Sequence, residues 1–341
     1  MDIETFLTTL YVVVDDWYKA ELQDEMVKHA GAVAHLSDSE VLTIALAGRW
    51  QVGIPWCSER SLVRWMQEHG RSMFPQMIGR SAFNARVRWL WGAFIRLQQI
   101  AARLLEKATD LYECVDCVPV PAFSNGQACK EPGHWLWEST TGHGGTSGGF
   151  YIGDKLLLSV SGPAGVVSGW LLGNADIQDR WLLEAFLSCR AGQPLLHGPA
   201  PDPHAAYAQR CSPPTGHLGA FQAVGPTRSS LYLADRGFNS RRWREHWLVQ
   251  YAASVLSIPS YNDAELGHWS SADRRFLASK RQPVETAFAF LSQVFGLKHL
   301  NAHSRWGQYT RLAATLAAYN IALFLNRSFG HPDHAFLTLL S

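Results

Sequence analysis

The sequence predicts an α/β protein in which a mixed β-sheet with flanking helices follows an all-helical N-terminal domain. Residues 1–110 place apolar side chains at helical spacing, whereas residues 111–174 contain short Val-rich and Leu-rich runs between Gly and Pro turns. After residue 179, helical and strand-like patterns alternate. The chain has 341 residues, enough for one large domain or two ordinary ones.

The composition excludes several classes of protein. Charged residues make up 17% and apolar residues 47%, and a folded protein of average composition has about 25% charged residues, so disorder driven by charge is excluded. No apolar run reaches about 18 residues, and the N-terminus carries acids where a signal peptide carries bases. We therefore expect a cytoplasmic protein with no membrane partner. The six unevenly spaced cysteines fit a reducing compartment.

Three helices are expected in the N-terminal region. Residues 36–50 offer Ser37 or Ser39 as a helix cap, followed by an acid and a run of apolar side chains. Residues 58–70 form a second periodic stretch that ends at a glycine, and a third helix is expected from about residue 81 to residue 107.

The charge of the N-terminal region is concentrated near the third helix. Residues 41–110 carry 10 bases against 4 acids, although the whole chain has a net charge of only +1. Residues 71–107 alone hold seven bases, which are Arg71, Arg80, Arg86, Arg88, Arg96, Arg103 and Lys107. A cationic face on a helical module indicates contact with double-stranded DNA, and a merely solvated helix surface is the alternative.

The second part of the chain reads as a sheet with helices packed on it. Strands are expected at 111–121, at 150–174 as a hairpin, at 229–238 and at 253–259; helices are expected at 179–187, at 240–251 and from about 282 to 327. This order is found in ribonuclease H-like folds, of which the retroviral integrases are one group. Residues 191–226 hold seven of the 16 prolines and are predicted to be a surface insertion.

Three acids fall where such a sheet places an active site. Asp116 lies inside an apolar strand, where an unpaired carboxylate costs several kcal/mol, and Asp235 ends the strand LYLAD. Glu285 belongs to the closing helix, four residues after Arg281. Two aspartates from strands and a glutamate from a helix form an oxygen-rich site that suits Mg²⁺ or Mn²⁺.

Structural explanations compete with this interpretation. Asp235 could cap the turn at Gly237, and Glu285 could lie in a first helical turn that begins at Pro283, where the helix dipole favours an acid. Cys114 and Cys117 form a C-x-x-C pair, but on a strand their side chains point to opposite faces, so a zinc site is not favoured.

The chain resembles insertion-sequence transposases of the DDE type. The resemblance rests on LSDSEVLTIAL, MFPQMIGRSAFNARVRWL, the strand with Asp116, GDKLLLSVSGPAGVVSGWLL, LADRGF and the terminal block that begins RQPVETAFAFL. These segments cover nearly the whole chain. The group includes the insertion-sequence families four, five and nine hundred and eighty-two, and the resemblance is widest to the last.

The resemblance implies a function. Asp116, Asp235 and Glu285 would be the catalytic and metal-binding triad, holding two Mg²⁺ or Mn²⁺ ions. Residues 1–110 would be a helical DNA-binding domain and residues 111–341 a ribonuclease H-like catalytic domain. The partners would be double-stranded DNA, as terminal inverted repeats and target, and a second copy in a homodimeric synaptic complex. Such a protein would be cytoplasmic and associated with the nucleoid.

One departure from related families concerns the cations of the closing helix. Those families carry a Tyr three residues before the Arg and a Lys seven after the Glu, where this chain has Ala278 and Ser292. The remaining cations expected to contact DNA there are Lys280, Arg281 and Lys298. Arg281 would hold a phosphate or pair with Glu285 across one helical turn. The rival functions are a catalytically inactive or domesticated transposase-derived DNA-binding protein and a stand-alone nuclease.

Overall fold

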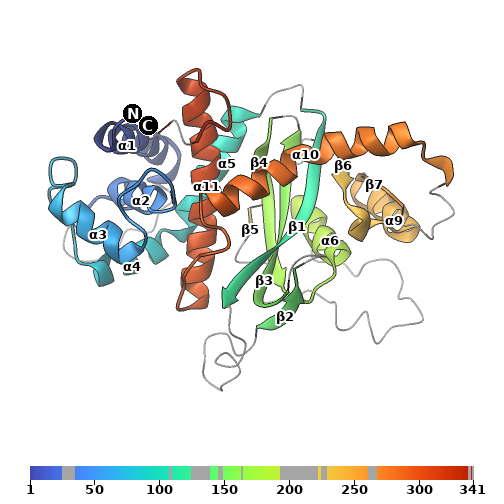
Figure 1. The fold of residues 1–341 in the computed structure, drawn as a ribbon, viewed down its shortest axis with the longest axis horizontal. Coiled ribbons are helices and arrows are strands. Elements are labelled where there is room, and N and C mark those ends of the chain that lie inside the picture. The colour runs from blue at the N-terminus through green and yellow to red at the C-terminus, as the bar shows by residue number, and fades with distance from the viewer. Residues whose placement is uncertain are drawn as a thin grey trace. The chain divides into compact units, whose positions relative to one another are not determined.

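The computed structural model describes residues 1–24, 35–106, 110–123, 139–144, 149–162, 164–192, 222–223, 229–259, 267–336 and 339. The chain forms two compact units, one of Met1–Leu105 with Phe290–Ser341 and one of Glu106–Ala289 (Figure 1). This grouping differs from the sequence-based division because residues 290–341 pack with the N-terminal helices. The functional division at residue 110 stays a prediction.

The first unit is helical, as expected. Its elements are α1 (Ile3–Trp17), the π-helical turn η1 (Tyr18–Leu22), α2 (Asp38–Ala47), α3 (Glu59–Glu68), α4 (Arg80–Trp89), α5 (Trp91–Leu105) and α11 (Arg305–Ser328). Ser37 caps α2 in a reciprocal arrangement with Glu40, and Ser58 caps α3, because each hydroxyl accepts a backbone N–H that the helix leaves unpaired. The first two predicted helices are confirmed.

The third predicted helix is wrong as a single element. Residues 80–105 form two helices, because Leu90 ends α4 with ψ at 13° and α5 starts at the next residue. Gly92 lies in the first turn of α5, and glycine supports a continuous helix poorly. Continuous apolar periodicity on both sides of Leu90 hides the break from sequence reasoning.

Helix α11 explains the strongly apolar end of the sequence. Most of its length is buried, and it lies along α5. Asn320 donates to the Gln98 carbonyl at 3.2 Å and Arg327 to the Leu105 carbonyl at 2.7 Å, so two polar side chains of α11 satisfy backbone groups of α5. An apolar helix with a few such polar anchors forms the core of the unit.

The second unit contains a mixed sheet of β1 (Tyr112–Phe123), β2 (Thr140–His143), β3 (Phe150–Gly162), β4 (Val166–Asn174), β5 (Gln222–Ala223), β6 (Leu231–Ala234) and β7 (Ser254–Ser257). Its order is β5-β4-β3-β1-β6-β7, with β2 paired to β3. The β1–β6 and β6–β7 pairs are parallel and the others antiparallel. This mixed α/β arrangement is consistent with the predicted ribonuclease H-like fold.

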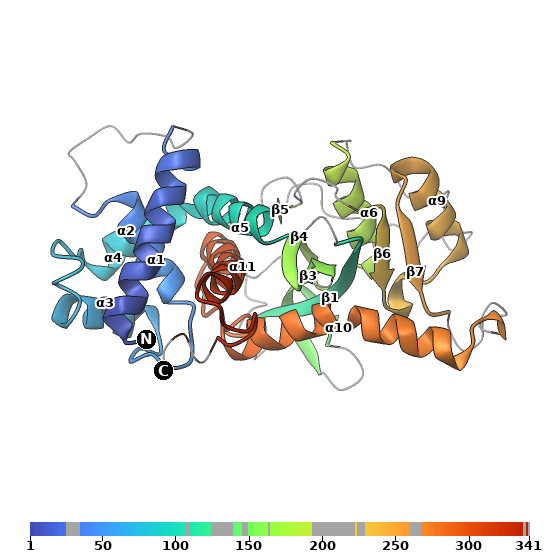
Figure 2. The same cartoon turned by 90° about the horizontal axis from the view of Figure 1, so that it is seen from above.

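Helices cover both faces of this sheet (Figure 2). Helices α6 (Asp179–Arg190) and α9 (Arg241–Tyr251) pack on one face of β1 and β6 around side chains such as Val115 and Phe186. The buried Glu184 of α6 accepts hydrogen bonds from three side chains of α9, which are His246, Trp247 and Tyr251, at 3.0, 3.0 and 2.7 Å. These bonds fix the position of α6.

Helix α10 (Ser271–Gln293) lies on the opposite face and differs from its prediction. The expected segment from 282 to 327 is two helices, α10 and α11, and α10 begins eleven residues earlier than expected. Pro283 is inside α10 rather than at its start, so a helix-dipole contact in the first turn does not explain Glu285. A proline inside a helix removes one backbone bond without always ending the helix.

Two further expectations concern the insertion and membrane-spanning helices. The predicted insertion at 191–226 lies outside the described residues, except for 191–192 and the short strand β5. No helix among the described residues combines the length and apolarity needed to cross a membrane.

Candidate active site

Asp116 and Asp235 are neighbours on two adjacent strands. The parallel register of β1 and β6 pairs Val115 with Ala234, and the next residue of each strand is the aspartate. Asp235 follows the last residue of β6, where its carboxylate accepts the Gly237 N–H at 2.8 Å. Asp116 accepts the N–H of Cys117 at 2.7 Å. The sheet therefore brings together the first two acids that the sequence singled out.

The charges of these acids oppose one another. Burial, and after it the negative charge of Asp235, raise the pKa of Asp116 to about 7 against the opposing effect of the Arg281 guanidinium. Burial also raises the pKa of Asp235, followed by the charge of Asp179, again against the effect of Arg281. Two partly buried carboxylates at this short separation need a cation to remain ionised together.

Arg281 of α10 is the cation that contacts Asp116. Its Nη2 lies 3.0 Å from Asp116 Oδ2, and its side chain is 13% exposed. One residue earlier, the Lys280 carbonyl accepts a hydrogen bond from Cys114 Sγ at 3.1 Å, on the same face of β1 as Asp116. The sequence predicts that Arg281 either holds a phosphate or pairs with Glu285. The acid that it pairs with in the structure is Asp116. The Nε of Arg281 is buried and has no hydrogen-bond partner among the described residues.

Glu285 forms no metal-holding group with the two aspartates in the described part of the chain, although its charge, like that of Asp116, acts on Cys114. It is exposed on α10, one turn after Arg281. Within the part of the chain that the structure describes, no three Asp, Glu, His or Cys side chains form a group able to hold a metal ion. The structure therefore brings Asp116 and Asp235 together and leaves the third acid of the predicted triad outside their cluster.

The donor set of the two aspartates nevertheless fits a hard divalent cation. Mg²⁺ commonly binds proteins through one or two carboxylates and keeps several of its waters. Asp116 and Asp235 offer such oxygens, and the repulsion between their charges is relieved by a positive ion. The residues that would hold Mg²⁺ or Mn²⁺ are therefore these two aspartates.

Sequence reasoning missed an acid near Asp235. Asp179 is the first residue of α6, and its charge raises the pKa of Asp235. Lys155 of β3 contacts Asp179 at 3.0 Å. An acid in the first turn of a helix is usual because of the helix dipole, so its sequence position gives no sign of a site.

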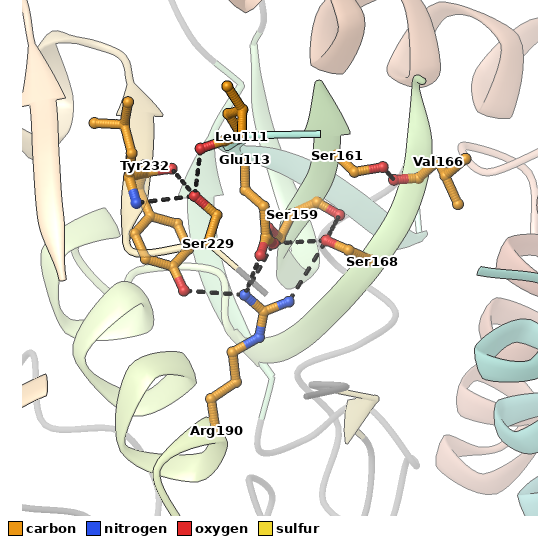
Figure 3. A network of polar contacts seen from close by, with 10 residues as sticks. Leu111, Glu113, Ser159, Ser161, Val166, Ser168, Arg190, Ser229 and Tyr232 are labelled. Atoms are coloured by element: carbon orange, nitrogen blue, oxygen red, sulfur yellow. Dashed lines mark hydrogen bonds and ion pairs between the residues drawn. The ribbon is translucent and has the colours of Figure 1, made fainter. Parts of the chain in front are cut away.

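Glu113 lies on the other face of β1 and has a different environment (Figure 3). It is 3% exposed and pairs with Arg190 of α6 at 2.8 Å. The hydroxyl of Ser168 donates to Glu113 at 2.6 Å, that of Ser159 also donates to it, and Tyr232 contacts Arg190 at 3.1 Å. This network satisfies the charge and the hydrogen bonds of a buried acid inside the fold.

The predicted DNA-binding arginines of the first unit differ in their surroundings. Arg71 and Arg80 are exposed, and Arg71 donates to the Gln67 carbonyl at 2.8 Å. Arg86 is 23% exposed and engages both Asp38 and the Leu36 carbonyl. Arg88 and Arg96 are half-buried. Of these five residues, Arg71 and Arg80 present most of their side chain to solvent.

The two lysines predicted to contact DNA lie in different units. Lys280 is half-buried on α10, with its ammonium 5.4 Å from the centre of the Phe276 ring. Lys298 is exposed and follows α10 within the first unit.

Comparison with curated proteins and with solved structures gave no match. Comparison with protein families gave one: residues 218–321 match the transposase DDE domain. The matched segment contains Asp235, Arg281 and Glu285, whereas Asp116 precedes it. Over this segment, the chain is similar to the transposase DDE domain family.

Proposed function

We propose that the chain is a DNA transposase that cleaves the ends of an insertion sequence and joins the freed 3′-hydroxyls to target DNA. The observation that carries the proposal is the pair of aspartates at adjacent strands, Asp116 and Asp235, in a fold consistent with a DDE domain. Mg²⁺ or Mn²⁺, as two ions, supplies an activated oxygen nucleophile and stabilises the leaving oxygen on phosphorus. Within the group, we assign the chain to the insertion-sequence family nine hundred and eighty-two.

The residues of the second unit take separate roles. Asp116 and Asp235 hold the cations, and Glu285 completes the triad from α10. Arg281 neutralises part of the charge of Asp116, and the exposed part of its guanidinium would contact a phosphate of the scissile strand. Lys280 and Lys298 add cationic contacts with the DNA backbone.

The helices of residues 1–110 bind duplex DNA in this proposal. Arg71 and Arg80 make the leading phosphate contacts because they are exposed, and Arg86, Arg88 and Arg96 lie on the same helical region. Two copies of the chain hold the two terminal inverted repeats in one synaptic complex.

One observation favours a second candidate function. Glu285 lies outside the aspartate cluster, as it would in a transposase-derived protein that binds DNA without cutting it. This candidate keeps the binding of DNA and predicts no metal-dependent cleavage.

The experiment that separates the candidates measures cleavage of duplex DNA from the flanks of the gene by the full chain with Mg²⁺. We expect wild-type cleavage, and a loss of at least about a thousandfold in Asp116→Asn, Asp235→Asn and Glu285→Gln, because each change removes one metal ligand charge at constant volume. Glu245→Gln, an exposed acid that pairs with Arg241 on α9, is the matched control.

Each result has a defined meaning. Retained cleavage in one of the three variants removes that residue from the triad. Binding of DNA without cleavage by the wild type supports the inactive DNA-binding protein. Cleavage without joining of the freed 3′-hydroxyls to target DNA supports a stand-alone nuclease.

A further inference from the structure

Asp179 presents its two carboxylate oxygens to different neighbours. Oδ1 accepts a hydrogen bond from Lys155 Nζ at 3.0 Å, and the same ammonium donates to the Ile177 carbonyl at 2.6 Å. The side chains of Lys155 and Asp179 are 19% and 28% exposed, so the pair is partly shielded from water. With Oδ1 bound to Lys155, the orientation of the whole carboxylate is fixed.

The second oxygen of Asp179 lies beside Gly237, as does the Asp235 carboxylate. A Cβ atom added to Gly237 would lie 2.8 Å from Asp179 Oδ2 and 3.1 Å from Asp235 Oδ1. Oxygens from two different carboxylates therefore converge on the space beside one glycine. A side chain at residue 237 would require the Asp179 carboxylate to shift.

The cations near the three aspartates leave Asp235 without an ion pair. Arg281 pairs with Asp116, and Lys155 pairs with Asp179. Among the described residues, Asp235 forms no ion pair, although its charge acts on Asp116 and the charge of Asp179 acts on it. Of the cations near these aspartates, only Arg281 acts on the charge of Asp235, and it is already paired with Asp116.

We propose that Asp179 is a fourth acidic residue of the active site, which helps Asp235 to bind a divalent cation, with Lys155 and Gly237 as the residues that position it. This inference rests on the proposed function, because it assigns Asp179 to the same metal-binding site. A cation that keeps part of its water shell needs only one or two carboxylates, so Asp179 and Asp235 suffice on this side of the site.

Calorimetry of Mn²⁺ binding to the full chain, without DNA, tests the proposal independently of cleavage. We expect Asp179→Asn to weaken Mn²⁺ binding about tenfold or more, the size typical for loss of a group that supports a metal site. Asp176→Asn is the matched control, because it removes the same charge from an exposed acid three residues away. It should leave Mn²⁺ binding unchanged.

Lys155→Met separates a site role from a purely structural one. This variant removes the same ion pair but keeps the Asp179 charge, so its Mn²⁺ affinity should fall much less than that of Asp179→Asn. Equal losses in the two variants would show that only the ion pair matters and would overturn the proposal. Gly237→Ala keeps every charge and should weaken Mn²⁺ binding by displacing the two carboxylates, which gives a second test if Asp179→Asn does not fold.

The outcomes also distinguish this inference from the proposed function. If Asp116→Asn and Asp235→Asn weaken Mn²⁺ binding but Asp179→Asn does not, the inference fails and the aspartate pair stands. If Asp179→Asn weakens binding but the wild type cleaves no DNA, the fourth acid stands and the transposase function fails. Absence of Mn²⁺ binding by the wild type overturns both.

Discussion

Two acids three residues apart on β1, Glu113 and Asp116, have opposite relationships with their surroundings. Glu113 faces α6, where Arg190 and two serine hydroxyls satisfy its carboxylate. Asp116 faces α10, which supplies one arginine partner, and its acidic neighbour is Asp235 at the end of β6. Both are charged groups in an otherwise apolar strand, and only one of them has its charge fully compensated.

The difference teaches how to separate a structural acid from a site acid. A buried carboxylate stabilises a fold only when cations and donors surround it, since the loss of hydration otherwise exceeds the gain. Glu113 meets that condition within the protein. Asp116 and Asp235 repel each other, which a folded protein tolerates where a ligand supplies the missing charge.

The largest expected effect on stability comes from Glu113. Glu113→Gln leaves the guanidinium of Arg190 buried without its counter-charge, so the free energy of unfolding should fall by about 3–5 kcal/mol. Urea denaturation followed by circular dichroism measures this change. Glu113→Gln combined with Arg190→Met should recover part of the loss, because no unpaired charge remains. If Glu113→Gln lowers the free energy of unfolding by less than about 1 kcal/mol, Glu113 is not a stabilising acid and does not differ from Asp116 in this respect.

The opposite effect is expected for Asp116 in the metal-free protein. Its pKa is raised from 3.8 to about 7 in the fold, so the folded state binds more protons than the unfolded state between these values. Stability from this group is present below pH 4 and is lost as the pH rises through 7. The wild type should lose on the order of 1–3 kcal/mol over this window, allowing for partial exposure of the carboxylate.

Asp116→Asn is the control for that pH dependence. At pH 8, with EDTA present, this variant should unfold at a higher urea concentration than the wild type, and its stability should change less between pH 4 and 8. Mg²⁺ should reduce the difference by stabilising the wild type. A variant with the same pH profile as the wild type would assign the effect to other groups.

Arg281 is the next test, because it is the only cation paired with Asp116 among the described residues. Arg281→Ala should lower cleavage by one to two orders of magnitude, about 1.4–2.7 kcal/mol of transition-state stabilisation, if its guanidinium holds a phosphate. If Arg281 only orients Asp116, high Mg²⁺ should restore the rate. Cleavage at saturating DNA, titrated with Mg²⁺, distinguishes these roles.

The sequence predicts β1, β3, β4, β6 and β7 because each of these strands carries its own signal, whereas β2 and the two-residue β5 are not predicted. The strand runs, the hairpin and the turn after Asp235 are local patterns, and all appear in β1, β3, β4 and β6. The register that places Asp116 beside Asp235 follows from the fold type. Breaks within periodic helices, such as Leu90, depend on backbone angles that apolar spacing does not encode.

The site is less predictable than the sheet. Asp179 and Lys155 are more than 20 residues apart and come together only because α6 packs against β3. Neither residue has a local signal, since an acid at the start of a helix is common. The position of Glu285 on α10 likewise depends on where that helix begins, which its internal Pro283 concealed.

The comparison between internally paired and unpaired side chains also applies to the predicted DNA-binding arginines. The change expected there, in DNA binding, is the smallest of those predicted. Arg86, like Glu113, has internal partners in Asp38 and the Leu36 carbonyl, whereas Arg80 at the start of α4 is exposed and has no ion pair among the described residues. Arg80→Glu should therefore weaken DNA binding and flatten its salt dependence by about one unit per lost phosphate contact. The melting temperature should remain near that of the wild type.

Arg86→Glu should show the reverse pattern, because a new acid facing Asp38 destabilises the helical unit. Its melting temperature should fall, and the salt slope of the folded protein should change less than in Arg80→Glu. Binding titrations from low to high salt, paired with thermal unfolding, separate the two arginines. If Arg86→Glu flattens the salt slope as much as Arg80→Glu, then Arg86 exchanges Asp38 for a phosphate on binding, and internal pairing no longer marks an arginine as structural.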